Sequence, residues 1–443
     1  MKAVLLCAWL FAATVSSAQL PFTAEALLPQ HEHVQTSGPV LSLEQLQDLA
    51  ISANPEIRLA VRQVSLAQAR VGAAGSLDDP MFMYRGWGVP LRQPLNLNQA
   101  QNMFMVTQTF PWFGKRALRS ESSQQEVAVA KAMLDGKRLE VRAKVRKAYA
   151  DLLLSREELR IHDEQVAIAR QGLEAARIKY TAGNVPQQDV LKAQIALTRL
   201  ADHLIMLQQR AQLARATLNT LIGHDPAAPL EGAGTYKPPE HLPTASALQS
   251  TALANRPELR GATATIQRNE SALKLARKAY GPDYTVSAGY MLMPGTSDPR
   301  NTYMAEFSLN LPWLNRRRHE SEIDQAKATL DASQAELDLE RSVIFQQIQE
   351  ALVRAQAAQE VADLYRNVLR PQTQATLRST VIAYENNRTD FLNLLDSQNA
   401  MLEVETSYVN AASEFESRLA DLELAIGAPI VRHSETVAKE ARQ

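Results

Sequence analysis

The sequence is almost without cysteine. Among its 443 residues the one cysteine, Cys7, lies in a short apolar run behind Lys2. Residues 1–18 combine a positive charge, that apolar run and small residues before Gln19, a pattern typical of a secretory signal peptide. We expect the exported chain to hold no cysteine, which excludes disulfide bonds, thiolate metal sites, a cysteine nucleophile and lipidation of a cysteine.

Other absences narrow the class of protein further. No apolar run is long enough to cross a membrane as a helix, and the net charge of −1 argues against a nucleic-acid surface. The sequence shows no phosphate-binding loop, no glycine-rich dinucleotide turn and no histidine pair at zinc spacing. We predict an exported protein that binds no nucleic acid, needs no cofactor and is not an enzyme.

Proline is missing from one unusually long stretch. Between Lys115 and Tyr180 the chain has no proline and few glycines, so it can form a helix of roughly 100 Å at 1.5 Å per residue. Residues 102–109 alternate as in a strand, and a proline-containing segment at 110–116 joins that strand to the helix. No ordinary soluble core buries such a helix from end to end.

The same strand, hinge and helix recur about 200 residues later. The first hinge reads Phe-Pro-Trp-Phe-Gly-Lys-Arg at residues 110–116, and the second reads Leu-Pro-Trp-Leu-Asn-Arg-Arg at residues 311–317. The hinge positions are Pro111, Trp112, Gly114, Pro312 and Trp313. The chain is therefore a duplicated strand-plus-long-helix unit.

This duplication sets the predicted division of the chain. The successive parts are a signal peptide at 1–18, an extended arm at 19–41, a first repeat at 42–223, a linker at 224–244, a second repeat at 245–427 and a tail at 428–443. The first repeat opens with a helix capped by Ser42 that runs to about Ala74. The remaining elements of the first repeat are strands at about 81–87 and 102–110, a long helix at about 115–180 and a return helix at about 187–222.

The second repeat is predicted to follow the same order. Its elements are strands at about 284–293 and 303–311, a long helix at about 316–384 and a return helix at about 389–426. Pro371 lies inside the second long helix, where a proline ring removes a backbone hydrogen bond and should kink the helix.

The predicted strands have two unlike faces. In 284–293, for example, Tyr284, Val286 and Tyr290 alternate with Thr285 and Ser287. An apolar face and a more polar one suit a barrel wall between lipid and water, and a half-buried sheet of a soluble protein is the alternative. Four strands cannot close a membrane barrel, and an open sheet edge in lipid leaves backbone groups unpaired. Several copies must therefore share one barrel.

The predicted helices carry apolar residues at intervals of seven. In the first long helix these are Val145, Leu152, Leu159, Val166, Leu173 and Tyr180, and in its return helix Val190, Leu197, Leu204, Ala211 and Leu218. Such repeats are typical of coiled-coil seams. A plain fibrous coiled coil is the alternative, but it explains neither the export signal nor the four amphipathic strands.

The hinge at 110–116, the two-fold repeat and the turn Tyr180-x-x-Gly183, followed by Asp189, resemble the TolC-like outer-membrane efflux family over about residues 42–427. The hinge is most similar to that of the heavy-metal (RND-type) efflux branch. The resemblance implies a mainly α fold with a small β part. It implies a homotrimer in which four strands per chain complete a transmembrane β-barrel, and in which the coiled-coil helices form a long periplasmic helical barrel.

The resemblance also implies a function and partners. The chain would conduct substrate passively out of the cell, with heavy-metal cations as the cargo. Its partners would be a periplasmic adaptor (membrane fusion) protein, an inner-membrane RND pump and outer-membrane lipid. A periplasmic coiled-coil adaptor or scaffold without a membrane barrel stays open as an alternative, as does a duct for drugs or other organic compounds.

In this family the helix tips and the acidic residues just beyond them form the periplasmic gate. The matching positions are Tyr180, Gly183, Asp189, Tyr384, Asn387, Arg388, Asn393 and Asp396. This sequence departs from the family pattern because Asn387 replaces the usual tip glycine and Asn393 a common acidic residue. Asp189 and Asp396 in three copies would draw cations toward a pore mouth, and solvated or helix-capping carboxylates are the alternative. Arg388 could pair with an acidic neighbour to hold the gate shut, and a surface arginine without a role is the alternative.

Methionine is concentrated in the predicted strand regions. The residues are Met81, Met83, Met103, Met105, Met291, Met293 and Met304. If their face lines the lumen, these thioethers are soft ligands that suit Cu(I) or Ag(I), and flexible apolar filler is the alternative. His31, Glu32 and His33 could bind a metal loosely, and an incidental cluster in the extended arm is the alternative. The other histidines considered, at positions 162, 203, 224 and 319, show no ligand spacing.

Overall fold

The structure is a computed structural model that describes residues 40–87, 92, 101–232, 242–293 and 301–430. The predicted signal peptide, the arm with His31, Glu32 and His33, and most of the linker and of the tail lie outside these residues. The described chain divides into two compact units. The hairpin unit consists of residues 155–213 and 367–407, and the sheet unit consists of the described parts of 40–154, 214–366 and 408–430.

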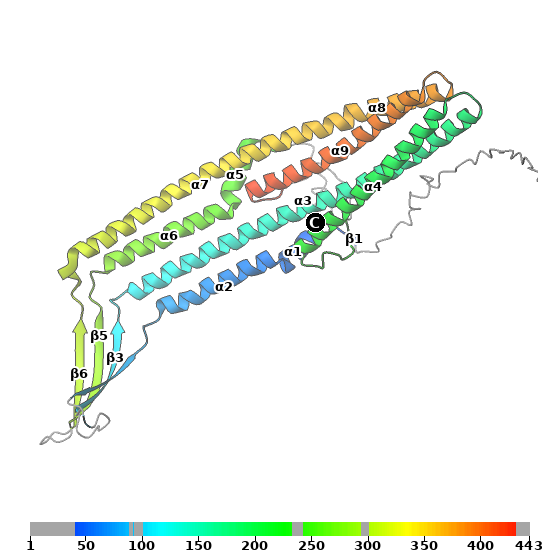
Figure 1. Cartoon of the computed structure of the whole chain (residues 1–443). Helices are drawn as coiled ribbons and strands as arrows, with labels where there is room; N and C mark the ends of the chain where they lie inside the picture. The colour runs from blue at the N-terminus through cyan, green and yellow to red at the C-terminus, as the bar shows by residue number, and fades with distance from the viewer. Residues whose placement is uncertain (1–39, 88–91, 93–100, 233–241, 294–300, 431–443) are drawn as a thin grey trace, which may run out of the picture. The chain divides into compact units, whose positions relative to one another are not determined.

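The two halves of the chain run through the same order of elements (Figure 1). The first half comprises β1 (Val40–Leu41), α1 (Leu43–Ala53), α2 (Pro55–Gly75), β2 (Met81–Trp87), β3 (Gln101–Phe110), α3 (Lys115–Thr181) and α4 (Gln187–Leu221). The second half comprises β4 (Glu231–Gly232), α5 (Ala245–Asn255), α6 (Pro257–Lys278), β5 (Tyr284–Leu292), β6 (Asn301–Leu309), the 3-10 helix η2 (Pro312–Asn315), α7 (Arg316–Leu364), the π-helix η3 (Tyr365–Leu369), α8 (Arg370–Glu385) and α9 (Phe391–Ile426). The predicted fold class, mainly helical with a small sheet and an internal repeat, is confirmed.

The segment after Ser42 forms two helices, where the sequence predicted one. Asn54 divides them, because its side-chain carbonyl accepts a 2.8 Å hydrogen bond from the amide of Glu56 and so caps α2, which begins at Pro55. The side-chain amide of Asn54 donates to the carbonyl of Leu221 at 2.9 Å. The break therefore ties the start of α2 to the end of α4.

The second repeat has an equivalent junction with different chemistry. Arg256 occupies the position before the first residue of α6, Pro257. Its guanidinium donates to the carbonyl of Leu424 at 2.8 Å, near the end of α9. A neutral amide in one half and a guanidinium in the other thus satisfy a carbonyl at the end of a return helix, where the helix leaves such groups without an internal partner.

Pro371 lies near the start of α8, directly behind the π-helix Tyr365–Leu369. The ring of a proline lacks a donor and crowds the carbonyl four residues earlier. A π-helical turn widens the helix at the place where that clash would occur. The helix therefore continues beyond the proline through a local change of winding.

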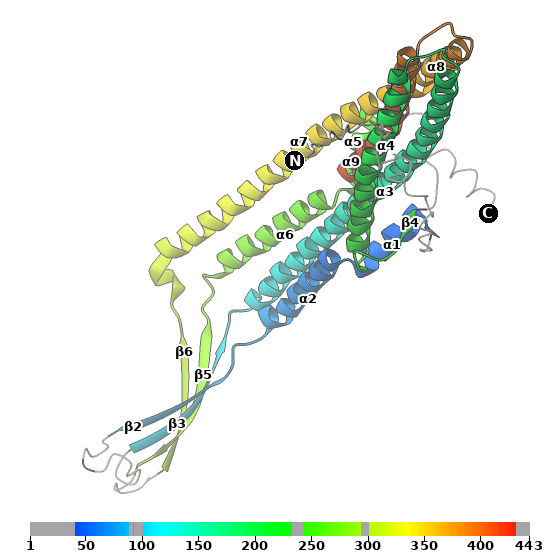
Figure 2. The same cartoon turned by 45° about the vertical axis from the view of Figure 1, so that its right-hand side comes forward.

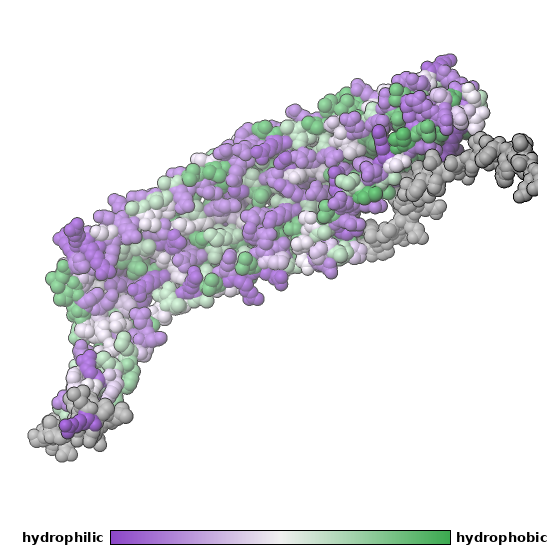
Figure 3. Space-filling view, viewed as in Figure 1, coloured by the Kyte–Doolittle hydropathy of each residue, from purple (hydrophilic) through white to green (hydrophobic). Residues whose placement is uncertain are grey.

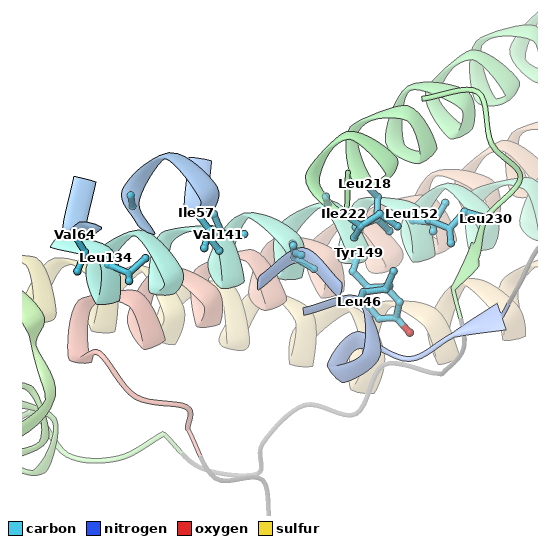
Figure 4. Packing of buried hydrophobic residues seen from close by; sticks show 14 residues of the cluster. Leu46, Ile57, Val64, Leu134, Val141, Tyr149, Leu152, Leu218, Ile222 and Leu230 are labelled. Atoms are coloured by element: carbon cyan, nitrogen blue, oxygen red, sulfur yellow. The ribbon is translucent and has the colours of Figure 1, made fainter. Parts of the chain in front are cut away.

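The heptad residues of the sheet unit lie in two apolar clusters, one in each repeat. Figure 4 shows the first, in which side chains of α1 and α2, such as Leu46 and Ile57, meet Val141 and Leu152 of α3 and Leu218 of α4. The second cluster is built in the same way around Ile344 of α7, Phe415 of α9 and Leu248 of α5. Burial of these side chains, at about 25 cal/mol per Å² of apolar surface, stabilises the long helices.

A buried ion cluster joins the two repeats inside the sheet unit. The Arg146 guanidinium on α3 contacts the carboxylates of Glu416, at 2.8 Å, and of Glu423, both on α9. Arg146 and Glu416 are buried. Burial alone would lower the pKa of Arg146, but the two carboxylates outweigh it and raise that pKa. The cluster therefore fixes the pairing of α3 with α9.

The four longer strands form one antiparallel sheet in the order β2-β3-β5-β6 (Figure 2). Residues opposite one another across antiparallel strands lie on the same face of the sheet. The register therefore places Met81, Met83, Met103, Met105, Met291 and Met304 on one face, here called the methionine face. Thr107, Thr285 and Ser287 lie on that face too.

The other face of the sheet, here called the apolar face, exposes large hydrophobic side chains. These are Phe82, Tyr84, Val106, Val286, Leu292, Tyr303, Phe307 and Leu309. Figure 3 shows pale and green surface, interspersed with purple patches, along the strands. A contiguous exposed apolar surface of this kind marks a contact with lipid or with another protein.

None of the helices that the structure describes is both long and apolar enough to cross a membrane.

Candidate functional site

The two helical hairpins of the hairpin unit end in tips with the same backbone geometry. In the first tip Gly183 has a φ of 74°, and the amide of Asn184 donates back to the carbonyl of Lys179 at 2.9 Å. In the second tip Asn387 has a φ of 57°, and the amide of Arg388 donates to the carbonyl of Ala383 at 2.8 Å. Both turns close a helix with a left-handed residue. Asparagine tolerates that conformation better than other residues with side chains, which explains how Asn387 replaces a glycine.

A lysine that sequence reasoning missed joins the two tips. Lys179, in the last turn of α3, donates to the side-chain oxygen of Asn387 at 2.6 Å and to the backbone carbonyl of Tyr384. Its ammonium also lies 4.2 Å from the centre of the Tyr384 ring, a cation–π distance. One positive charge of the first hairpin thus contacts three groups of the second, and we call this set the Lys179 latch.

Tyr180 and Tyr384 occupy equivalent places in the two repeats but have different surroundings. Tyr180 is 43% exposed, whereas Tyr384 is 3% exposed and packs against Phe391 with 5.9 Å between ring centres. Burial, with a smaller contribution from the Asp189 carboxylate, raises the pKa of Tyr384. The Tyr384 hydroxyl is buried and has no hydrogen-bond partner among the described residues. Asp189 therefore lies near a buried aromatic of the opposite hairpin.

The remaining predicted gate residues lie around the second tip. Asn393 donates from its backbone amide to the Asp390 carboxylate at 2.9 Å and from its side chain to Thr389 at 3.1 Å. Asp390 thereby caps α9, and Asn393 belongs to that cap. Asp396 and Arg388 are exposed, and Arg388 forms no ion pair with another residue that the structure describes. The structure thus brings Tyr384 and Asn387 together through Lys179 and leaves Arg388 outside the contact.

The first hinge is held by a carboxylate that the sequence did not single out. Asp283, just before β5, accepts hydrogen bonds from the backbone amide of Trp112 and from the Lys115 ammonium, both at 2.7 Å. Lys115 also donates to the carbonyl of Gly281 at 2.9 Å. Gly114 has a φ of 83°, which lets the chain turn from Pro111 into α3.

Trp112 lies against the backbone of Gly281. A Cβ atom on Gly281 would stand 2.2 Å from Cδ1 of Trp112, so a side chain at this position would collide with the indole. In the second hinge Pro312 is buried and Trp313 is 53% exposed. The two hinges are therefore alike in sequence but differ in how their tryptophans pack.

The predicted metal residues form one group on the sheet, apart from Met293, which follows the end of β5. Met103 lies opposite Met291, and Met83 lies opposite Met105. Across the described residues, no group of three or more His, Cys, Asp or Glu side chains is arranged to hold a metal ion. The sulfur atoms of the methionine face are therefore the candidate metal ligands in this structure.

Two histidines without ligand spacing in the sequence come together in the hairpin unit. The rings of His162 on α3 and His203 on α4 lie 6.1 Å apart, and His162 Nε2 lies 2.8 Å from the carbonyl of Leu200. Burial and the neighbouring His162 lower the pKa of His203, Glu158 and Asp202 act in the opposite direction, and Arg210 adds to the lowering. Glu158 is buried and paired with Arg210 at 2.6 Å. This polar group lies within the coiled coil and stabilises a neutral His203.

Comparison with known proteins gives a consistent result. The family model described as outer membrane efflux protein matches residues 46–224 and 248–428. The cobalt-zinc-cadmium resistance protein CzcC of Cupriavidus metallidurans is 24% identical over 383 residues, which cover 86% of this chain and 88% of that protein. Nodulation protein T of Rhizobium leguminosarum bv. trifolii is 23% identical over 392 residues, which cover 85% of this chain and 83% of that protein.

A solved structure extends the likeness to the fold. The outer membrane protein VceC from Vibrio cholerae has a TM-score of 0.70 at 19% sequence identity, covering 87% of this chain and 96% of that chain. This likeness concerns the fold over most of both chains.

Proposed function

This chain belongs to the outer membrane efflux protein family, and from that premise we propose that it is the exit duct of a tripartite efflux system for heavy-metal cations. Membership confirms the family predicted from the sequence. The chain is a passive outer-membrane efflux channel with its helical part in the periplasm, and it is not an enzyme. The proposal adds the cargo, the assembly and the gate.

The sheet supports a trimeric assembly. Its apolar face exposes eight large hydrophobic side chains, which suits contact with lipid. Strands β2 and β6 are the two edges of this sheet, and an unpaired edge in lipid costs several kcal/mol for each backbone group. Three copies joined edge to edge would pair every strand. We therefore propose a homotrimer whose strands close one barrel in the outer membrane.

The hairpin tips support a gate. The Lys179 latch joins the first hairpin to the second through contacts that a small rotation of one hairpin would break. The Asp189 carboxylate contributes to the raised pKa of Tyr384, after burial. We propose that these tips close the channel at rest. A periplasmic adaptor, working with an inner-membrane RND pump, would open it by separating the hairpins.

The cargo is inferred from a relative and from the sheet. CzcC carries cobalt, zinc and cadmium resistance in its name and matches this chain over most of both lengths. The methionine face adds thioether donors, which suit soft metal ions. The observation that carries the proposal is the sheet itself, because its two unlike faces match a wall between lipid and a passage for polar cargo.

The test is the metal tolerance of the source bacterium after deletion of the gene. Growth is measured against cobalt, zinc, cadmium, copper and silver salts, and against a panel of organic compounds. We expect the deletion to lower tolerance to at least one metal and the gene supplied in trans to restore it. Sensitivity to organic compounds alone would contradict the metal cargo. Unchanged tolerance to the whole panel would contradict an exit duct.

A second measurement tests the assembly. Native mass spectrometry of the protein released from detergent is expected to give three times the mass of the mature chain. A monomer that stays in solution without detergent would instead support the periplasmic scaffold considered above.

A further inference from the structure

We propose that the methionine face carries a binding site for a soft monovalent cation, Cu(I) or Ag(I), formed by the thioethers of Met103, Met105, Met291 and Met304. The inference rests on the proposed function, because it makes this cation a cargo that passes through the strand region.

The strand register brings these four residues together. Met103 lies directly opposite Met291, Met105 lies opposite Gly289, and Gly289 lies opposite Met304. Opposed residues have Cβ atoms about 5 Å apart. Two adjacent rows of the sheet therefore contribute four thioethers from three neighbouring strands.

Gly289 leaves room at the centre of the group. A Cβ atom on Gly289 would stand 3.5 Å from both Cβ and Cγ of Met105, so the Met105 side chain lies over the glycine. Met304 flanks Gly289 on its other side. Met105 and Met304 thus lie on either side of a position that carries no side chain.

Burial distinguishes this group from surface methionines. Met103 is 3% exposed and Met105 is 7% exposed, while Met291 and Met304 are half-buried. Met81, on the edge strand, is 66% exposed. Met83 is half-buried too, but its sulfur accepts a hydrogen bond from Arg85 at 3.6 Å, so it is not counted among the four proposed ligands.

The composition of the two faces argues against simple filling of space. On the methionine face of the described strands every aliphatic side chain is a methionine, and the companions are polar residues, glycine and Trp87. The apolar face of the same strands has phenylalanine, tyrosine, valine, leucine and alanine, together with Gly86, Asn102, Gln108 and Asn301, and has no methionine at the described positions. If methionine only supplied flexible apolar volume, it should occur on both faces. A requirement for sulfur on one face explains why it occurs on one face only.

One positive and one negative side chain, Arg85 and Glu306, lie near the four methionines on the same face of the sheet. Arg85 lies opposite Met103 on the edge strand, but its guanidinium donates to the sulfur of Met83 at 3.6 Å and lies 5.3 Å from the centre of the Trp87 ring. Glu306 follows Met304 by two residues on the same face of β6. The carboxylate thus lies beside the proposed site on β6, while the guanidinium is engaged on β2.

Ligand chemistry selects the ion. Thioethers are neutral, soft donors that favour Cu(I) over ions such as zinc or cobalt, which prefer imidazole, thiolate or carboxylate ligands. No cluster of the latter donors occurs among the described residues. The geometry therefore points to a soft monovalent ion, which differs from the three metals in the name of CzcC.

The test is a titration of the full-length mature protein in detergent with silver nitrate, in chloride-free buffer, followed by calorimetry. The sheet variant carries Met103→Leu, Met105→Leu and Met291→Leu, which conserve volume and remove sulfur. The matched control carries Met133→Leu, Met206→Leu and Met401→Leu, three methionines of the helices. We expect the wild type and the control to bind silver with equal affinity, and the sheet variant to bind at least tenfold more weakly.

Two results would overturn the site. One is silver binding by the sheet variant that equals that of the wild type, and the other is an equal loss in the helix control. If the triple sheet variant does not fold, Met103→Leu and Met105→Leu are titrated singly, and each must weaken binding at least threefold. Bilayer conductance of the same preparations reports on the duct separately. Conductance without a sulfur-dependent silver site refutes this inference alone. Silver binding by a protein that neither conducts nor needs detergent to stay in solution refutes the duct alone.

Discussion

Replacing Lys179 with leucine should open the channel more often. The substitution removes two hydrogen bonds from a charged donor, to Asn387 at 2.6 Å and to the carbonyl of Tyr384, and one cation–π contact at 4.2 Å. Hydrogen bonds of charged groups contribute roughly 1.5–3 kcal/mol each, and an exposed cation–π contact adds about 0.5–1 kcal/mol.

The net effect is smaller than the sum of these contributions. Lys179 is half-buried, so water can form hydrogen bonds with some of the groups that the lysine contacted. We therefore expect a loss of about 1.5–3 kcal/mol from the closed state. Since 1.4 kcal/mol is a factor of ten, the ratio of open to closed channels should rise about 10- to 150-fold.

The assay is single-channel recording in planar lipid bilayers, with opening probability as the readout. Lys192→Leu, which removes a lysine charge from α4 of the same hairpin unit, is the control and should leave that probability within twofold of the wild type. Asn387→Gly keeps a residue suited to the φ of 57° while it removes one acceptor. Its effect should be less than additive with Lys179→Leu. An opening probability of Lys179→Leu that equals that of the wild type would refute the latch.

Two further predictions concern stability. Gly281→Ala should lower the unfolding temperature in detergent, because the new Cβ would stand 2.2 Å from Trp112 and such overpacking costs about 1–3 kcal/mol. The control is Gly72→Ala, where a Cβ would meet nothing within 4 Å. An equal unfolding temperature for Gly281→Ala and the wild type would contradict the packing described. Burial and His162 lower the pKa of His203 below its ordinary 6.5. The unfolded chain therefore takes up a proton at His203 more readily than the folded chain. The free energy of unfolding should be full above about pH 6.5 and should fall as the pH drops below that value. Denaturant unfolding at pH 8 and pH 5.5 measures that fall; His203→Gln should reduce it, and an equal fall in both proteins would count against the assignment.

The fold class followed from regular patterns in the sequence. Apolar residues every seven positions indicated long packed helices, and Val145, Leu152 and Leu218 are indeed buried. Alternation of residue types indicated the strands. The repeat was visible because the hinge sequence occurs twice. Each helix, strand and hinge is marked by residues close together in the chain, so a single sequence was sufficient to predict the fold class.

Contacts between distant residues could not be read in the same way. Lys179 meets Tyr384 and Asn387, and Asp283 meets Trp112, across long stretches of chain. Their pairing depends on which helices and strands become neighbours, and nothing near Lys179 in the sequence specifies its partners. The break at Asn54 is different, because an asparagine before a proline is a visible helix-start signal that the predicted single helix ignored.

The central claim is that this chain forms a channel gated at its hairpin tips. The most direct test is the conductance of the purified protein in planar bilayers, before and after Asp189→Ala and Asp396→Ala. The account predicts discrete cation-selective steps in the wild type, with selectivity reduced by the substitutions, because carboxylates at a pore mouth attract cations. No steps from any of these proteins, combined with solubility without detergent, would contradict it.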